Sequence, residues 1–132
     1  MGHDLSAVAD KNFAAWNGAL LGGDPERVAS LYGEECSFLP TMAGDFRQGR
    51  ERAAGYFRHF LERHPSGTVV EGRVQALGEG TYIHAGLYDF EVDGRDGGRE
   101  TVRARFTFVW RLDGDRWSIV HHHSSALPQA AA

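Results

Sequence analysis

The N-terminal half of the chain carries apolar and polar residues at helical spacing. Apolar residues recur every three or four positions from Leu5 to Leu20, which places one mostly apolar stripe along a helix that Gly22-Gly23 ends. An Asp-Pro-Glu cap follows and predicts a second helix over about 24–32. Alanine and aromatic residues on one side predict a third helix over about 50–63.

The pattern changes at Thr68, where apolar and polar residues begin to alternate and β-branched and aromatic side chains become common. A short strand, Cys36 to Leu39, is also expected before the third helix. Three helices ahead of a four-strand meander predict an α+β fold, with the helices covering one face of a curved antiparallel sheet. Glycine-bearing turns separate the four strands, which are expected at about 68–77, 80–92, 99–112 and 115–126.

The last hairpin decides which side chains face the helices. With a two-residue turn at Asp113-Gly114, counting outward places Phe106 opposite His121 and Ala104 opposite His123. The face that carries the aromatic residues of this hairpin must be the buried one. The two imidazoles are therefore predicted to point inward with it.

Buried imidazoles need hydrogen-bond partners, because leaving one unpaired costs about 1–3 kcal/mol. Either His121 and His123 are structural residues that tie the last strand to its surroundings, or they line a polar cavity as a catalytic proton donor and acceptor. His122 is predicted to point to the surface or an interface. The side chains expected to bind a ligand in such a cavity are His84, Tyr88, Trp16, Tyr32, Met42, Phe57, Phe106, Phe108, Trp110 and Ser125.

Other chemistry has less support in the sequence. His84, His121 and His123 would give three imidazoles of the kind that bind zinc or iron, but no carboxylate lies at an inward strand position, so no metal is predicted. No glycine fingerprint for nucleotides occurs, so no cofactor is predicted. The single cysteine, Cys36, is expected to be a buried small apolar residue. The segment Thr41 to Ala43 is either an ordinary connection or a lid.

Composition limits the classes of partner. The 132 residues form one predicted domain, 5–128, with a frayed tail at 129–132. Fourteen basic and 18 acidic residues give a net charge of -4 with scattered arginines, which argues against nucleic acid and membrane partners. Neither a long apolar run nor a leader pattern is present, so we expect a cytoplasmic protein.

The other face of the last two strands is neither plainly polar nor plainly apolar. Arg103, Arg105 and Arg111 are interrupted there by uncharged residues, Val109 and Val120 among them. Such a mixed face on an otherwise exposed sheet predicts a two-fold homodimer interface.

Three segments carry a family resemblance: WNGALLGGDPERVASLY, QGRERAAGYFRHFL and, from Phe106 to Pro128, FTFVWRLDGDRWSIVHHHSSALP. Together they make the chain resemble the calcium/calmodulin-dependent protein kinase II association domain and the small conserved proteins of enediyne polyketide gene clusters. Both belong to the nuclear-transport-factor-two-like superfamily. The resemblance implies a cone-shaped fold, pairing through the outer sheet face, and an internal pocket whose use varies among members.

The chain also departs from patterns that the resemblance implies. Phe108 and His84 stand where the kinase domains carry pocket arginines, and the strand Cys36 to Leu39 lacks the aspartate base of the steroid isomerases. His121 and His123 stand on the strand where polyketide cyclases place a carboxylate. We therefore expect a dimer that binds a largely apolar small molecule, such as a polyketide or polyene intermediate, with or without cofactor-independent cyclisation or isomerisation. The alternative is a structural association module whose pocket is incidental.

Overall fold

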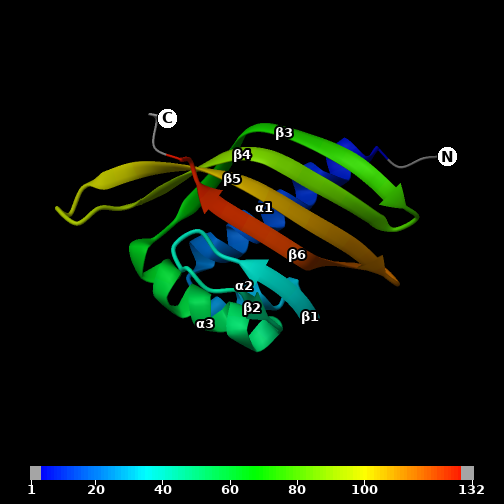
Figure 1. Cartoon of the computed structure of the whole chain (residues 1–132), viewed down its shortest axis with the longest axis horizontal. Coiled ribbons are helices and arrows are strands. Elements are labelled where there is room, and N and C mark those ends of the chain that lie inside the picture. Colours follow the sequence, from blue (N-terminus) through cyan, green and yellow to red (C-terminus); the bar gives the residue numbers. More distant parts are fainter. Residues whose placement is uncertain (1–3, 129–132) are drawn as a thin grey trace.

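A six-stranded, unclosed sheet curves around a layer of helices in this computed structural model, which describes residues 4–128 (Figure 1). The strand order is β2-β1-β6-β5-β4-β3, and every neighbouring pair is antiparallel except β1 with β6. The helices are α1 (Leu5–Gly22), α2 (Pro25–Ala29) and α3 (Arg50–Phe60), followed by the 3-10 turn η1 (Leu61–Arg63). The strands are β1 (Tyr32–Leu39), β2 (Arg47–Gln48), β3 (Ser66–Gly78), β4 (Thr81–Asp93), β5 (Arg99–Asp113) and β6 (Arg116–Ala126).

The predicted α+β arrangement of three helices and a four-strand meander is confirmed. The α2 helix is shorter than expected, because the Leu31 carbonyl accepts a hydrogen bond from the Ile119 amide and β1 already begins at the next residue. The parallel pairing of β1 with β6 and the short strand β2 were not predicted. The tail expected to fray, 129–132, lies outside the described residues.

Capping groups set the helix boundaries. The Asp4 carboxylate accepts hydrogen bonds from the first turn of α1, and Gly23 ends that helix in the left-handed region at φ 76°. The Asp24 carboxylate accepts from the Glu26 amide at 3.0 Å and caps α2. No helix within the described range is long and apolar enough to cross a membrane.

The core lies between the helices and the inner sheet face, and it is rich in aromatic rings. Trp16 of α1 stacks nearly parallel to Tyr88 of β4, with ring centroids 6.2 Å apart. Phe57 of α3 stacks in the same way on Phe38 of β1 at 5.6 Å. The helices are thereby attached to both halves of the sheet.

The β5–β6 hairpin differs from its prediction in two ways. Its two turn residues are Gly114 and Asp115, one position later than expected. This shift moves the partner of Ile119 from Phe108, as predicted, to Trp110, but leaves Ile119 on the inner face. A β-bulge then inserts Val120 as an extra residue. Because side chains alternate along a strand, the bulge exchanges the two faces of β6 for every residue that follows it.

A pair of facing glycines brings β3 and β4 close together. Gly72 lies opposite Gly86, next to a register irregularity in β3. A methyl group added to Gly86 would overlap the carbonyl oxygen of Glu71, and one added to Gly72 would lie 2.9 Å from His84 Nε2. Only glycine fits this approach, and His84 occupies the space that it leaves.

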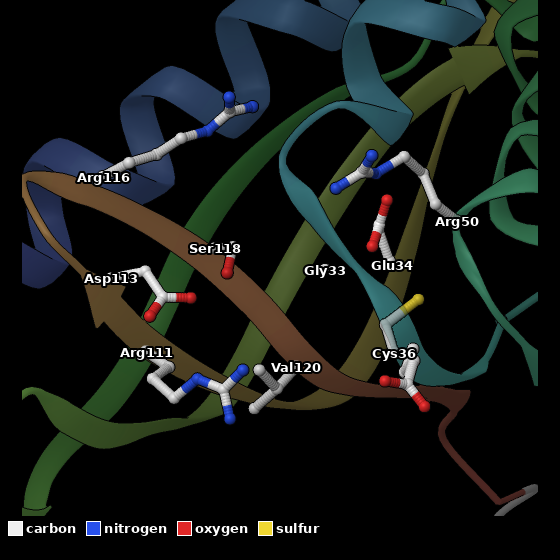
Figure 2. Close-up of a pocket in the computed structure, with 10 residues that line it drawn as sticks. Gly33, Glu34, Cys36, Arg50, Arg111, Asp113, Arg116, Ser118 and Val120 are labelled. Atoms are coloured by element: carbon white, nitrogen blue, oxygen red, sulfur yellow. The ribbon is translucent and has the colours of Figure 1, made fainter.

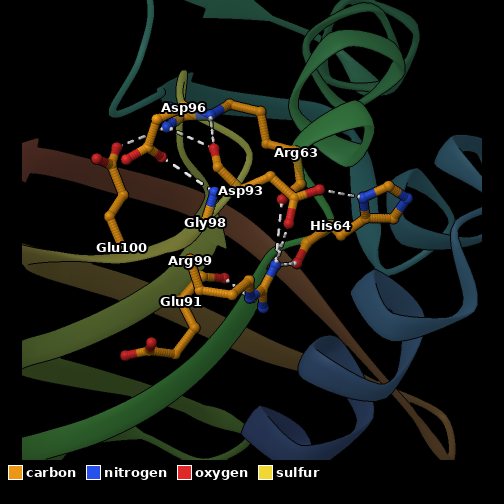
Figure 3. Close-up of polar contacts among 8 residues, drawn as sticks. All are labelled: Arg63, His64, Glu91, Asp93, Asp96, Gly98, Arg99 and Glu100. Atoms are coloured by element: carbon orange, nitrogen blue, oxygen red, sulfur yellow. Dashed lines mark hydrogen bonds and ion pairs between the residues drawn. The ribbon is translucent and has the colours of Figure 1, made fainter.

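The β4–β5 hairpin extends beyond the body of the sheet and is fixed at its base by charged residues (Figures 1 and 3). The Arg63 guanidinium, at the end of η1, donates to the Asp93 carbonyl oxygen at 3.1 Å and to Glu100 at 2.8 Å. Arg99 and His64 both bind the Asp93 carboxylate, at 3.0 and 2.6 Å. These contacts join the hairpin to the end of the helical layer.

Candidate functional site

His122 lies at the centre of the core on β6. It is 2% exposed, and its ring is stacked between Phe108, at a centroid distance of 4.0 Å, and Phe38, at 5.0 Å. The bulge at Val120 turns this imidazole inward. The prediction that His122 points outward is therefore wrong.

His122 is the middle member of a buried chain of hydrogen bonds. Its Nδ1 lies 2.8 Å from the Tyr32 hydroxyl, and its Nε2 lies 3.1 Å from the Tyr88 hydroxyl. Trp16 Nε1 donates to the Tyr32 oxygen at 3.2 Å, while the Tyr88 hydroxyl donates to Ser124 Oγ at 2.6 Å. The chain thus connects α1, β1, β4 and β6 through the interior.

The directions of these hydrogen bonds assign the tautomer of the imidazole. Because Tyr88 gives its proton to Ser124, its oxygen accepts from His122, and Nε2 carries the hydrogen. Nδ1 then accepts the proton of Tyr32, whose oxygen accepts from the indole. A neutral His122 therefore has both of its nitrogens satisfied within the protein.

Burial keeps the side chains of this hydrogen-bond chain uncharged at neutral pH. It lowers the pKa of His122 well below its usual value, and the neighbouring His121 and His123 lower it further. Burial also raises the pKa of Tyr32 and Tyr88. The chain can hold protons at fixed atoms or bind a carbonyl or hydroxyl group of a ligand, but only when one of its internal hydrogen bonds opens.

His121 and His123 lie on the outer face of the sheet, so their predicted inward orientation is wrong. Counting from the turn could not detect the bulge at Val120, which reverses the facing of both residues. His121 Nδ1 lies 2.7 Å from Ser37 Oγ of β1, and His123 is exposed opposite Thr107. Their catalytic role stays a prediction, now for a pair outside the core.

Most of the residues predicted to line a cavity do lie on the inner side, where they pack against one another. These buried residues are His84, Tyr88, Trp16, Tyr32, Phe57, Phe106, Phe108 and Trp110. Ser125 is on the outer face opposite Arg105, and Ser124 takes the inner position that was assigned to it. The ligand-binding role of all these residues stays a prediction.

The three imidazoles considered as metal ligands do not lie on the same face of the sheet. His84 faces the helices, whereas His121 and His123 face away from them. Between residues 4 and 128 no cluster of three or more histidine, cysteine or acidic side chains is arranged to hold a metal ion. Cys36 is buried as expected, and burial raises the pKa of its thiol.

A small pocket of about 290 Å³ opens between α3 and the loop after β1. Met42, Ala43, Tyr56 and Phe60 form its apolar wall, and the basic residues Arg47, His59 and Arg63 complete its lining. The Tyr56 hydroxyl accepts a hydrogen bond from the Met42 amide at 3.3 Å. Met42, predicted to line an interior cavity, is instead half exposed in this loop.

The pocket adjoins the end of the buried hydrogen-bond chain. Thr41, the residue before Met42, is hydrogen-bonded through its hydroxyl to Ser124. The loop after β1 therefore covers the outer end of the hydrogen-bond chain. His122, Ser124 and this role of Thr41 were missed from the sequence, because the inward facing of His122 and Ser124 follows from the bulge at Val120, which the residue pattern does not reveal.

An uncharged band crosses the outer face of the sheet, the face opposite to the one that helices α1 to α3 cover (Figure 1). Arg111 borders the band at one end of β5, and Arg103 and Arg105 border it at the other. His121 and His123 lie within it, beside β1. We define the uncharged band as Leu39 of β1, Ile83 and Ala85 of β4, Thr107 and Val109 of β5 and Val120 of β6.

The arrangement of helices and strands identifies the structural class of this protein. Helices on one side of a curved, open sheet of this strand order form a nuclear-transport-factor-two-like fold. A Streptomyces avermitilis protein of that class, provisionally assigned as a dehydratase, superposes with a TM-score of 0.79 at 16% identity, covering 92% of this chain and 95% of its own. This likeness shows the fold alone.

Sequence comparison then gives the family. Residues 6–128 match the calcium/calmodulin-dependent protein kinase II association domain. A Xanthomonas campestris protein provisionally assigned to that domain is 35% identical, with a TM-score of 0.90 and coverage of 98% of this chain and 91% of its own. The Chlamydomonas reinhardtii hub homology domain is 20% identical, with a TM-score of 0.79 and coverage of 95% and 100%. A search of curated proteins finds no match. This chain belongs to the calcium/calmodulin-dependent protein kinase II association domain family.

Proposed function

We propose that this protein is a self-association module that forms at least a homodimer through the outer face of its sheet. The observation that carries the proposal is the uncharged band, bordered by arginines at both ends and left uncovered by the helices. Protein interfaces have this distribution, with few charges at the centre and a polar rim. Membership of a family whose relatives are described as association and hub domains supports the same function.

The interior supports association over ligand binding. The inner face is filled by aromatic rings, and the imidazole at its centre has both nitrogens bonded to protein groups. A core packed in this way stabilises a rigid platform for an interface. The outer face, by contrast, leaves apolar side chains such as Val109 and Ile83 half exposed.

A charge placed in the band tests this function. Val109→Glu puts a carboxylate at the centre of the band, while Val70→Glu makes the same change at an exposed position of β3 outside it. Light scattering after size exclusion is expected to give a dimer or larger assembly for the wild type and for Val70→Glu, and a folded monomer for Val109→Glu. A monomeric wild type, or an unchanged mass for Val109→Glu, would contradict the proposal.

As a second candidate, we propose that a largely apolar small molecule, such as a polyketide or polyene intermediate, enters at the pocket between α3 and the Thr41–Ala43 segment. Two observations favour it: the apolar wall of this pocket and the end of the hydrogen-bond chain directly behind Thr41. A ligand that displaces this loop would reach Ser124 and Tyr88. If chemistry occurs, proton transfer along the chain without a cofactor is the reaction class that these groups support.

Filling the pocket tests this second candidate. Ala43→Trp occupies the pocket, and Ala76→Trp adds the same ring at an exposed position of β3. The fluorescent probe 1-anilinonaphthalene-8-sulfonate is expected to bind the wild type and Ala76→Trp with one affinity and to lose that binding in Ala43→Trp. Equal binding by all three proteins would exclude the pocket as the site.

A further inference from the structure

A charged groove opens on the outer face where β1 separates from β6. The parallel pairing of these strands shifts register between Tyr32 and Ser37, and the intervening segment leaves a groove of about 550 Å³ (Figure 2). Strands β1, β5 and β6 and the first residue of α3 line it. Six of its lining residues are charged, namely Glu34, Glu35, Arg50, Arg111, Asp113 and Arg116.

These charges have no ionic partners among the residues that the structure describes. Within residues 4–128, none of the six takes part in an ion pair, whereas pairs such as Arg58 with Glu26 form elsewhere. Arg50 Nε donates to the Tyr32 carbonyl at 2.8 Å. Arg116 similarly donates to a backbone carbonyl, that of Ser30, at 2.7 Å.

Arginines held by backbone carbonyls are positioned without being neutralised. A carbonyl oxygen fixes the guanidinium but carries no net charge, so the positive charge and the remaining N–H groups stay available to a carboxylate. The Arg111 side chain makes no hydrogen bond to another described residue and is exposed on the β5 side of the groove. The groove therefore presents guanidinium groups and carboxylates that can still form pairs.

The balance of charge indicates which partner fits. A two-fold interface brings the same patch of both copies together, so a patch of one sign would repel itself. The charges of the three arginines and three carboxylates sum to zero, so the arginines of one copy can pair with the carboxylates of the other. The groove is also continuous with the uncharged band, because Val120 belongs to both and Arg111 follows Val109 on the same side of β5.

We infer that the charged groove is the ionic part of the interface between two copies of this chain, where the carboxylates of one copy pair with the arginines of the other. This inference rests on the proposed self-association. Charges at an interface set orientation and association rate, and salt screens them. The uncharged band then contributes apolar burial, while the groove determines how the two copies align.

Opposite charge reversals test the inference. Arg111→Glu makes the groove more negative by two charges, and Glu35→Lys makes it more positive by two. Sedimentation velocity at low salt is expected to show self-association weakened at least about tenfold for each variant alone. An equimolar mixture of the two variants is expected to associate as tightly as the wild type, because each groove then meets the opposite sign.

Matched reversals outside the groove serve as controls. Arg73→Glu and Glu79→Lys change the same charges at exposed positions on and next to β3, and both are expected to associate like the wild type. A wild type that stays monomeric would overturn both the proposed function and this inference. A wild type that associates while Arg111→Glu and Glu35→Lys behave like it, or whose weakened variants are not restored by mixing, would overturn the inference alone.

Discussion

Replacing His122 with glutamine is expected to make the free energy of unfolding less dependent on pH. In the folded protein the imidazole is buried between Phe108 and Phe38, and burial lowers its pKa well below the usual value. In the unfolded chain it titrates normally. At mildly acidic pH the unfolded state therefore binds one more proton than the folded state, and stability falls as the pH is lowered.

The magnitude follows from the two pKa values. With an unfolded pKa of about 6.5 and a folded pKa far below it, His122 alone costs the wild type about 1.4 kcal/mol of stability between pH 7.5 and pH 5.5. Glutamine does not titrate. At pH 7.5 the His122→Gln variant is expected to be less stable by about 1–3 kcal/mol, because the bonds to Tyr32 and Tyr88 are lost or distorted. This deficit should shrink by about 1.4 kcal/mol at pH 5.5.

Urea unfolding followed by tryptophan fluorescence measures the effect. Both proteins are compared at one protein concentration, because self-association also contributes to stability. His59→Gln on the exposed side of α3 is the control for the same replacement outside the core. A His122→Gln deficit that is the same at pH 7.5 and pH 5.5 would refute the reasoning, since it would mean that the folded imidazole titrates like a free one.

Further predictions concern the hydrogen-bond chain, the sheet and the hairpin. Tyr88→Phe leaves the imidazole donor unpaired in the core and should cost about 1–3 kcal/mol in urea unfolding, with no loss of secondary structure by circular dichroism. Gly86→Ala should cost at least about 2 kcal/mol, because its methyl group meets backbone of the neighbouring strand, whereas Gly18→Ala, with open space around it, should not destabilise; equal melting temperatures would contradict this account. Arg63→Ala should speed amide exchange at 94–98 while changing global stability by less than about 1 kcal/mol, and unchanged exchange there would show that these contacts do not hold the hairpin.

Helix and strand positions follow from local pattern and agree well with the structure. The apolar stripe of α1, the caps of α2 and the alternation after Thr68 each report on a segment by itself. The parallel pairing of β1 with β6 was beyond such patterns, because it joins residues 84 to 87 positions apart in the sequence, as in Ser37 with His121 and Tyr32 with Ile119. Nothing in the few residues of β1 specifies a partner that distant.

The candidate site depends on which face of the sheet each side chain of β6 occupies. Side-chain facing in β6 was counted from the turn, and two features changed that count. The one-residue displacement of the turn preserved the facing of Ile119, but the bulge at Val120 reversed it for the three histidines that follow. The aromatic residues of β5 were placed correctly because no irregularity occurs between them, and this is why Phe106 and Phe108 face the core as predicted.

Three histidines in a row have one more consequence. If β6 slid by one residue against β5, His121 or His123 would replace His122 beneath Tyr32 and Tyr88, and an imidazole would still occupy the core. Hydrophobicity therefore discriminates weakly between neighbouring alignments at this end of the strand. In the observed alignment one imidazole lies between two phenol groups, and Ser124 follows it on the inner side. Deleting Val120 would remove the extra residue and make His121 follow Ile119 directly, so that regular alternation along the strand alone would send His122 inward and leave His121 and His123 outside.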